Sequence, residues 1–396
     1  MTILFMDEPL LARTPPPTLS RLFLAFLRLG ITAFGGPAMI AYIRERAVER
    51  ENWLTKEVFQ DGIALCQTIP GATAMQVAAY VGLRVQGVRG AVVSYVGFGL
   101  PAFLLMLLLS TVYVRAHALP VVIAVFSGLQ ALIVAVVANA AISFGRTTLT
   151  SWRQGVIALM AAALFWMVVH PVLILLLAAL LAMALHSRQP VPLLAGTRTK
   201  IPVTFRPLVC LIAVAAAGFA LLAFFSHPLA QLAMLMARID LIAFGGGFAS
   251  VPLMFHEIVE VRGWLTGPTF LDGIALGQFT PGPIVITATF VGYLLHGLAG
   301  ACVATSAMFL PSLLLVIGIA PYFARLRASL WFRRAISGVL CSFVGLLATV
   351  TIRFALQVHW DWLHLLLGVA ALGALLRKID ILWVIVAGTV VSLLFL

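Results

Sequence analysis

The sequence contains one unit twice, in a register of about 210 residues. The segment DGIALCQTIPGA at 61–72 matches DGIALGQFTPGP at 272–283, and eight of the twelve positions are identical. The same register aligns RLGITAFGG at 28–36 with RIDLIAFGG at 238–246. Chance does not keep segments aligned over such a length, so the chain is predicted to fold as two copies of one unit.

The composition predicts that both copies lie in a membrane. Hydrophobic residues make up 63% of the 396 residues, and charged residues make up only 10%. Soluble domains are about half apolar and a quarter charged, so a water-soluble enzyme is excluded. Because roughly 20 apolar residues cross a bilayer, this content is sufficient for a polytopic membrane protein with short loops.

Apolar segments predict about six spans in each copy, the first two near 21–42 and 61–83, and one linking span between the copies, thirteen in total. The second copy then begins after an odd number of spans, so it is predicted to lie upside down relative to the first. The expected fold is an all-α polytopic membrane protein of two inverted repeats with broken helices. Its predicted parts are a cytoplasmic N-terminal arm at 1–20, a first repeat at 21–187, a basic linker at 188–206, a linking span at 207–228 and a second repeat at 229–396.

Loop charges agree with this inversion. The first-copy loop with Arg84 and Arg89 corresponds to a second-copy loop with only His296, whereas four arginines within 325–334 correspond to Arg115 alone. Basic loops are cytoplasmic as a rule, so loops that alternate in charge predict opposite orientations. The net charge of +12 is then loop charge, and no nucleic-acid partner is expected.

One loop disagrees with this topology. Residues 43–60 would lie outside the cell, yet they carry Arg44, Arg46, Arg50 and Lys56. A re-entrant first segment in place of a first span would return this loop to the cytoplasmic side.

Two arginines occupy equivalent positions within apolar stretches, and each lies six residues before a glycine break. An arginine at membrane depth is costly unless it faces a cavity or a partner, and its planar fork of donors suits an oxyanion. Glycines that break a helix expose N–H groups able to bind an anion. We interpret both sets as an anion clamp, the alternatives being arginines that extend to the membrane surface and glycines that allow close helix packing. The residues are Arg28, Phe34, Gly35, Gly36 and Pro37 in the first copy, and Arg238, Phe244, Gly245 and Gly246 in the second.

A second break recurs after each DGIAL segment. Proline removes a backbone donor and frees carbonyl groups, and the glycine beside it gives the chain room to turn. Paired broken segments in two inverted halves indicate the midplane site of a transporter, where glutamine and threonine side chains would bind the ligand. The residues are Gln67, Thr68, Pro70 and Gly71, and Gln278, Thr280, Pro281, Gly282 and Pro283.

Asp61 and Asp272 begin the two DGIAL segments. The favoured interpretation is that each caps a helix N-terminus, and the alternative is a proton-carrying role. The sequence has no catalytic triad, zinc-ligand spacing or phosphate-binding loop. We therefore predict no catalytic residue, no metal and no cofactor.

At these motifs the sequence resembles the chromate transporter (CHR) family in its long, two-domain form. The resemblance rests on FGGP at 34–37, WLT at 53–55, QTIPGA at 67–72 and QFTPGP at 278–283. It implies a carrier in the cytoplasmic membrane that exports chromate, with sulfate-like anions as related substrates. This chain departs from the family pattern at Ala38-Met39-Ile40, where many members have a histidine, at Gly247 in place of proline, and at the PGA ending of the first copy.

The predicted function is export of chromate by alternating access around a midplane site between the repeats. A dianion that leaves a cell with an interior potential of −100 mV gains about 4.6 kcal/mol, at about 2.3 kcal/mol per charge. Export therefore needs no coupled ion. The alternatives are a sulfate-type uptake symporter and an anion channel. The expected partners are the oxyanion and the lipid bilayer, and a homo-oligomer is compatible with the sequence.

Overall fold

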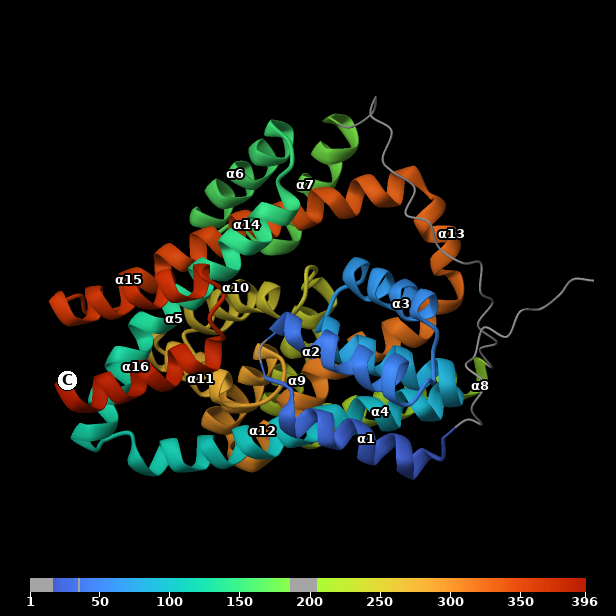
Figure 1. The fold of residues 1–396 in the computed structure, drawn as a ribbon, viewed down its shortest axis with the longest axis horizontal. Coiled ribbons are helices and arrows are strands. Elements are labelled where there is room, and N and C mark those ends of the chain that lie inside the picture. The colour runs from blue at the N-terminus through green and yellow to red at the C-terminus, as the bar shows by residue number, and fades with distance from the viewer. Residues whose placement is uncertain (1–16, 35, 186–204) are drawn as a thin grey trace, which may run out of the picture.

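The computed structural model describes residues 17–34, 36–185 and 205–396, which fold as helices joined by short loops (Figure 1). The all-α class is confirmed. The predicted N-terminal arm and basic linker fall mostly outside the described residues. The helices of the first copy are α1 (Leu19–Thr32), α2 (Gly36–Arg44), α3 (Lys56–Thr68), α4 (Thr73–Ala116), α5 (Pro120–Thr148), α6 (Trp152–Trp166) and α7 (Pro171–Leu185).

The second copy repeats this order of elements and adds the short helix α13 between α12 and α14. Helix α8 (Phe205–Phe225) precedes it, and a π-helical turn recurs at Glu45–Arg50 and His256–Val261. Short 3-10 turns, Gly247–Ala249 and Ile284–Ile286, lead into α10 and α12. The helices are α9 (His227–Ile242), α10 (Ser250–Phe255), α11 (Gly267–Phe279), α12 (Thr287–Ile319), α13 (Phe323–Ala328), α14 (Leu330–Gln357), α15 (Trp362–Leu376) and α16 (Ile381–Phe395).

Helix α3 and the first arm of α4 form a hairpin. A Cβ added to Gly62 would lie 2.3 Å from the ring of Tyr80, although a straight helix would separate these residues by about 27 Å. The chain reverses between Thr68 and Thr73, and the equivalent pair Gly273 and Phe290 marks the same hairpin in the second copy. The single span expected near 61–83 is therefore wrong, because its two halves lie side by side.

A second reversal follows within α4 itself. Gln86 and Gly87 leave helical geometry, and the Ser94 hydroxyl donates to the Ala78 carbonyl at 2.8 Å. A Cβ on Gly82 would lie only 2.2 Å from a backbone oxygen of the opposite arm, so glycine is what permits the close approach. In α12 the turn falls at His296 and Gly297.

The two copies are interlocked through their last helices. Helix α5 of the first copy packs against α15 and α16 of the second, and α14 of the second packs against α6 and α7 of the first (Figure 1). Glycines lie at these crossings: a Cβ on Gly345 of α14 would lie 2.1 Å from the Ala158 carbonyl oxygen of α6. The repeats are therefore units of sequence and not separate bodies in space.

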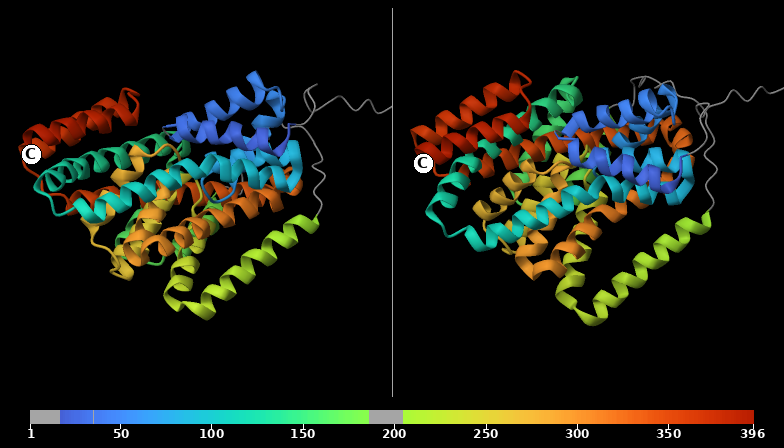
Figure 2. Two further views of the ribbon diagram at one scale, coloured as in Figure 1. Left: turned by 90° about the horizontal axis from the view of Figure 1, so that it is seen from below. Right: turned by 60° about the horizontal axis from the view of Figure 1, so that its bottom comes forward.

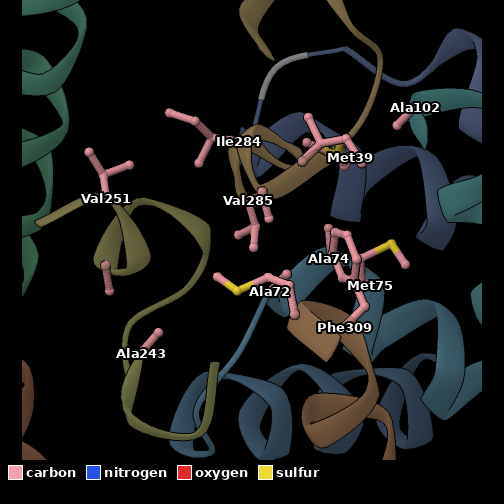
Figure 3. Packing of buried hydrophobic residues seen from close by; sticks show 14 of the residues in the cluster. Met39, Ala72, Ala74, Met75, Ala102, Ala243, Val251, Ile284, Val285 and Phe309 are labelled. Carbon is pink, nitrogen blue, oxygen red and sulfur yellow. The ribbon is translucent and has the colours of Figure 1, made fainter. Parts of the chain in front are cut away.

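Buried side chains of both copies form one continuous core. Figure 3 shows part of it, with Met39 of α2 and Ala74 of α4 near Ile284 and Val285, which precede α12. The hairpin tips and glycine breaks of the two copies meet in this region.

Five described helical segments are long and apolar enough to cross a membrane, so the chain is a multi-pass membrane protein. Helices α6, α7, α15 and α16 are also apolar, but each has 15 residues. They are about 22 Å long, which is less than the ~30 Å hydrocarbon core. The structure therefore has five long apolar segments and four shorter apolar helices among the described residues, and the count of about six spans per copy stays a prediction. The five segments are Thr73–Ala116, Pro120–Thr148, Arg206–Phe225, Ile284–Ala328 and Leu330–Gln357.

The first segment, expected as a span near 21–42, is interrupted. Helix α1 ends at Thr32 and α2 begins at Gly36. By contrast, α8 is uninterrupted and stands apart from the bundle (Figure 2). Its apolar side chains are exposed around the helix, among them Leu221, Phe224 and Phe225, as expected for a helix surrounded by lipid.

Candidate functional site

A cavity of about 640 Å³ lies where the breaks of the two copies meet, a volume typical of small-ligand sites. Its wall contains both hairpin tips, the segment after each Phe-Gly-Gly motif and one face of α5. The lining residues include Phe34, Met39, Gln67, Ala72, Thr73, Asn139, Ser143, Phe144, Thr147, Gly245, Gly246, Gly247, Gln278, Thr280, Gly282, Pro283 and Ile284.

Helix N-termini from both copies begin at this wall. Helix α4 begins at Thr73, and the 3-10 turns that lead into α10 and α12 begin at Gly247 and Ile284. No side chain caps any of these three starts. Their first N–H groups therefore lie at the cavity wall without an acceptor from a capping side chain, and the helix dipoles add positive potential there.

Glycines with positive φ make these breaks. Gly71 and Gly282 at the hairpin tips have φ of +116° and +125°, and Gly245 and Gly246 have +96° and +94°, a region that other residues rarely adopt. The Gly71 amide donates to the Ala243 carbonyl at 2.9 Å. This bond joins the first hairpin tip to the glycine break of the other copy.

Among the described residues, the cavity is lined mainly by apolar groups, with a few polar side chains and no charged ones. No Lys, Arg, Asp or Glu occurs among its described lining residues. The side-chain amides of Gln67, Asn139 and Gln278 face it, and none of the three has a hydrogen-bond partner among the described residues. Unpaired amide donors and uncapped helix N-termini are both neutral groups that are able to bind an anion.

The structure brings together many of the residues that the sequence singled out. Phe34, Gln67, Gly245, Gly246, Gln278, Thr280, Gly282 and Pro283 line the cavity, whereas Thr68 and Phe244 do not. The hydroxyls of Thr68 and Thr280 donate to Leu65 and Gly277 carbonyls within their own hairpins. Pro70, Gly71 and Pro281 form the tips, Gly36 and Pro37 begin α2, and Gly35 lies outside the described residues.

The two predicted clamp arginines lie elsewhere. Arg28 is exposed on α1, and neither guanidinium lines the cavity. Arg238 lies 3.6 Å from the Glu257 carboxylate and contacts His170, beside a smaller pocket of about 380 Å³ that Arg262 and Trp264 also line. The structure gives the clamp no support.

The family model of chromate transporters matches the chain twice, over residues 20–183 and 230–393. The chain belongs to the chromate transporter family. It is 33% identical over 369 residues to the chromate transport protein of Cupriavidus metallidurans, covering 92% of this chain and 89% of that protein.

Other relatives of this chromate transporter family member match over nearly the same length. An uncharacterized transporter of Methanocaldococcus jannaschii is 37% identical, covering 96% of this chain and 95% of its own. A probable chromate transport protein of Synechococcus elongatus is 32% identical, covering 92% of each chain. No solved structure matches. As a member of this family the protein is a transporter and not an enzyme.

The two recurring acids of this family member do not cap helices, so the favoured interpretation is wrong. Thr55 and Thr266 are the N-caps, and each side chain accepts a hydrogen bond from the backbone amide three residues later. The acids lie inside α3 and α11. Asp61 pairs with Arg327 at 3.3 Å. Asp272 accepts hydrogen bonds instead from Tyr113 and Gln130.

Sequence reasoning missed the face of α5. Asn139, Ser143 and Thr147 recur every four residues and line the cavity. Polar residues at this spacing in an otherwise apolar helix form one stripe. This stripe is the sequence signal that could have identified the α5 face.

The repeat-equivalent face of α14 is closed. Thr349 and Phe354, which correspond to Asn139 and Phe144, are buried, and the ring of Phe354 packs edge-on against Phe255 at 5.0 Å. Arg353 corresponds to Ser143. It forms an ion pair with Glu260 and donates to the carbonyls of Phe165 and Trp166 at 2.8 and 3.0 Å.

Proposed function

We propose that this protein exports chromate, a tetrahedral dianion, across the cytoplasmic membrane and binds it in the cavity between the two copies. The observation that supports this proposal is an uncharged cavity with uncapped helix N-termini and unpaired amides from both copies. Transport requires a site that binds strongly enough for entry and weakly enough for release. Neutral donors meet both demands, because no fixed countercharge holds the ion.

Alternating access is the mechanism that the asymmetry of the two copies supports. The α5 face lines an open cavity, whereas the equivalent α14 face is sealed by the Phe354 contacts and the Arg353–Glu260 pair. In inverted repeats, an exchange of these two arrangements opens the site to the opposite side of the membrane. A channel would require both faces to be open at once.

The hairpins also support a consistent topology. If α1 and α2 form a re-entrant segment, the basic loop at 43–60 returns to the cytoplasmic side with the N-terminus, as the positive-inside rule requires. The hairpin of α3 and the first α4 arm then begins and ends on that same side, so Arg84 and Arg89 at the next turn are cytoplasmic too.

The direct test is chromate uptake into inside-out vesicles that contain the protein, with sulfate as competitor. An interior-positive potential, which corresponds to the normal gradient in inverted vesicles, should accelerate uptake. Sulfate has the same shape and charge, so it should compete. Uptake no faster than in vesicles without the protein would refute the proposal.

The cavity amides provide a sharper prediction. Gln67→Leu and Gln278→Leu each remove one donor to a charged ligand, worth about 1.5–3 kcal/mol, so the chromate concentration for half-maximal uptake should rise about tenfold or more. Gln60→Leu is the matched control, because Gln60 is exposed on α3 and lies outside the cavity lining. An unchanged half-maximal concentration in both cavity variants would remove these amides from the site.

A further inference from the structure

Asp272 is a buried acid without a countercharge. It is 7% exposed within α11, and its two carboxylate oxygens accept hydrogen bonds from the Tyr113 hydroxyl at 2.7 Å and the Gln130 amide at 2.8 Å. No Lys, Arg or His forms an ion pair with it among the described residues. Both donors are neutral, so the carboxylate is hydrogen-bonded but its charge is not compensated. A buried charge of this kind is costly.

The repeat-equivalent acid has a different environment. Asp61 pairs with Arg327 of α13 at 3.3 Å, and the first-copy residue equivalent to Arg327 is His117, which stacks on the Tyr113 ring at 5.8 Å. One acid of the pair therefore has a permanent cation beside it, and the other has only neutral donors. The shared DGIAL sequence thus gives two acids whose partners differ in charge.

Asp272 is connected to the cavity through two helices. Gly277, which lines the cavity, follows it by five residues on α11, and Val136, which also lines it, follows Gln130 by six residues on α5. These offsets correspond to about 7.5 and 9 Å along a helix. A dianion in the cavity would repel an ionised Asp272 across a medium of low dielectric, and a proton on Asp272 would remove this repulsion.

Few other groups titrate near this carboxylate. Helix α4 contributes Tyr113, with His117 stacked behind it, and α5 contributes the neutral Gln130. Among the described parts of α12, α14 and α16, which also pack against α11, no basic residue contacts Asp272. The proton balance of this region is therefore set by Asp272.

We propose that Asp272 is a proton-binding site coupled to the anion cavity, so that a proton and the dianion bind together. The proton adds to a carboxylate oxygen when the anion binds and leaves when the anion leaves. This inference rests on the proposed function, because it requires an oxyanion in the cavity.

The test is sulfate binding to the purified full-length protein at several pH values. Sulfate is the probe because it stays a dianion from pH 5.5 to 8, whereas chromate itself takes up a proton near neutral pH. Wild-type protein should bind sulfate roughly tenfold more tightly at the acidic end, within the usual range of couplings between sites, and should take up protons on binding. Asp272→Asn mimics the protonated acid, so it should bind tightly at every pH and take up none.

Two further variants make the outcome decisive. Asp61→Asn is the matched control and should retain the pH dependence. Tyr113→Phe removes one donor to the ionised carboxylate, so the pH midpoint of sulfate affinity should move upward, and this variant keeps the ring that packs against Phe290. Sulfate affinity independent of pH in wild-type protein, or a pH profile unaltered by Tyr113→Phe, would overturn the inference. Failure of wild-type protein to bind either sulfate or chromate would refute the proposed function instead.

Discussion

Gly345→Ala is expected to lower the free energy of unfolding by about 3 kcal/mol. A Cβ at this position of α14 would lie 2.1 Å from the Ala158 carbonyl oxygen and 2.8 Å from the Ala162 amide nitrogen of α6. Both atoms belong to a helix backbone, so neither can move aside as a side-chain tip could. Overpacking of a tight interface costs about 1–3 kcal/mol and occasionally more. We expect the upper end, about 3 kcal/mol, which is a large share of a typical stability of about 5–15 kcal/mol.

The measurement is the amount and melting temperature of monodisperse protein extracted in detergent. Gly155→Ala in α6 is the matched control, because a Cβ there would meet no atom within 4 Å. It should leave stability unchanged or raise it, since alanine favours a helix by about 1 kcal/mol over glycine. Equal stability of the two variants would contradict the close crossing of α14 over α6.

This crossing shows what the sequence could and could not predict. The repeat register was visible, because the pair Ser127-Gly128 recurs as Ser337-Gly338 at a fixed offset. The residues that these glycines contact could not be predicted from the sequence. Gly128 approaches Ser392 of the second copy, and Gly338 approaches Ala178 of the first. An exchange of helices between copies leaves no mark on hydropathy or on spacing.

The hairpins were unpredictable for a related reason. Residues 61–83 form one apolar run, and hydropathy has the same value whether the chain continues or folds back. A continuous span and a hairpin differ in the contact between Gly62 and Tyr80. This is a tertiary contact, so hydropathy does not record it. The breaks themselves carried local signals in proline and glycine, and these signals led to Gln67, Gln278 and the rest of the cavity wall.

The acids and the arginines mark the limit of motif reasoning. Asp61 and Asp272 share the sequence DGIAL, yet their partners lie more than a hundred residues away and differ in charge. Arg238 was placed at an anion site because an arginine at membrane depth needs a partner. The partner is Glu257, an internal carboxylate and not a ligand.

Glu260→Gln is expected to open the closed α14 face. Arg353 and Glu260 are largely buried, with 11% and 18% of their side chains exposed. Without the carboxylate the guanidinium loses its ion pair and keeps neutral partners, the carbonyls and rings of Phe165 and Trp166. Removing one partner of a buried pair costs about 3–5 kcal/mol, because the other charge is left uncompensated. A state in which water reaches Arg353 does not bear this cost, so its population relative to the closed state should rise roughly a hundredfold.

The readout is the reactivity of Thr349→Cys with a membrane-impermeant thiol reagent, in protein whose four native cysteines, Cys66, Cys210, Cys302 and Cys341, are replaced. Thr349 is 3% exposed, so this thiol should be protected in the parent protein and labelled at least about tenfold faster when Glu260→Gln is added. Glu49→Gln is the matched control. Glu49 is the repeat equivalent of Glu260, but its pair with Arg44 is half-exposed, and an exposed pair contributes little. If the thiol stays protected in folded Glu260→Gln protein, the ion pair does not hold this face closed, and the aromatic packing of Phe354 against Phe255 must do so alone.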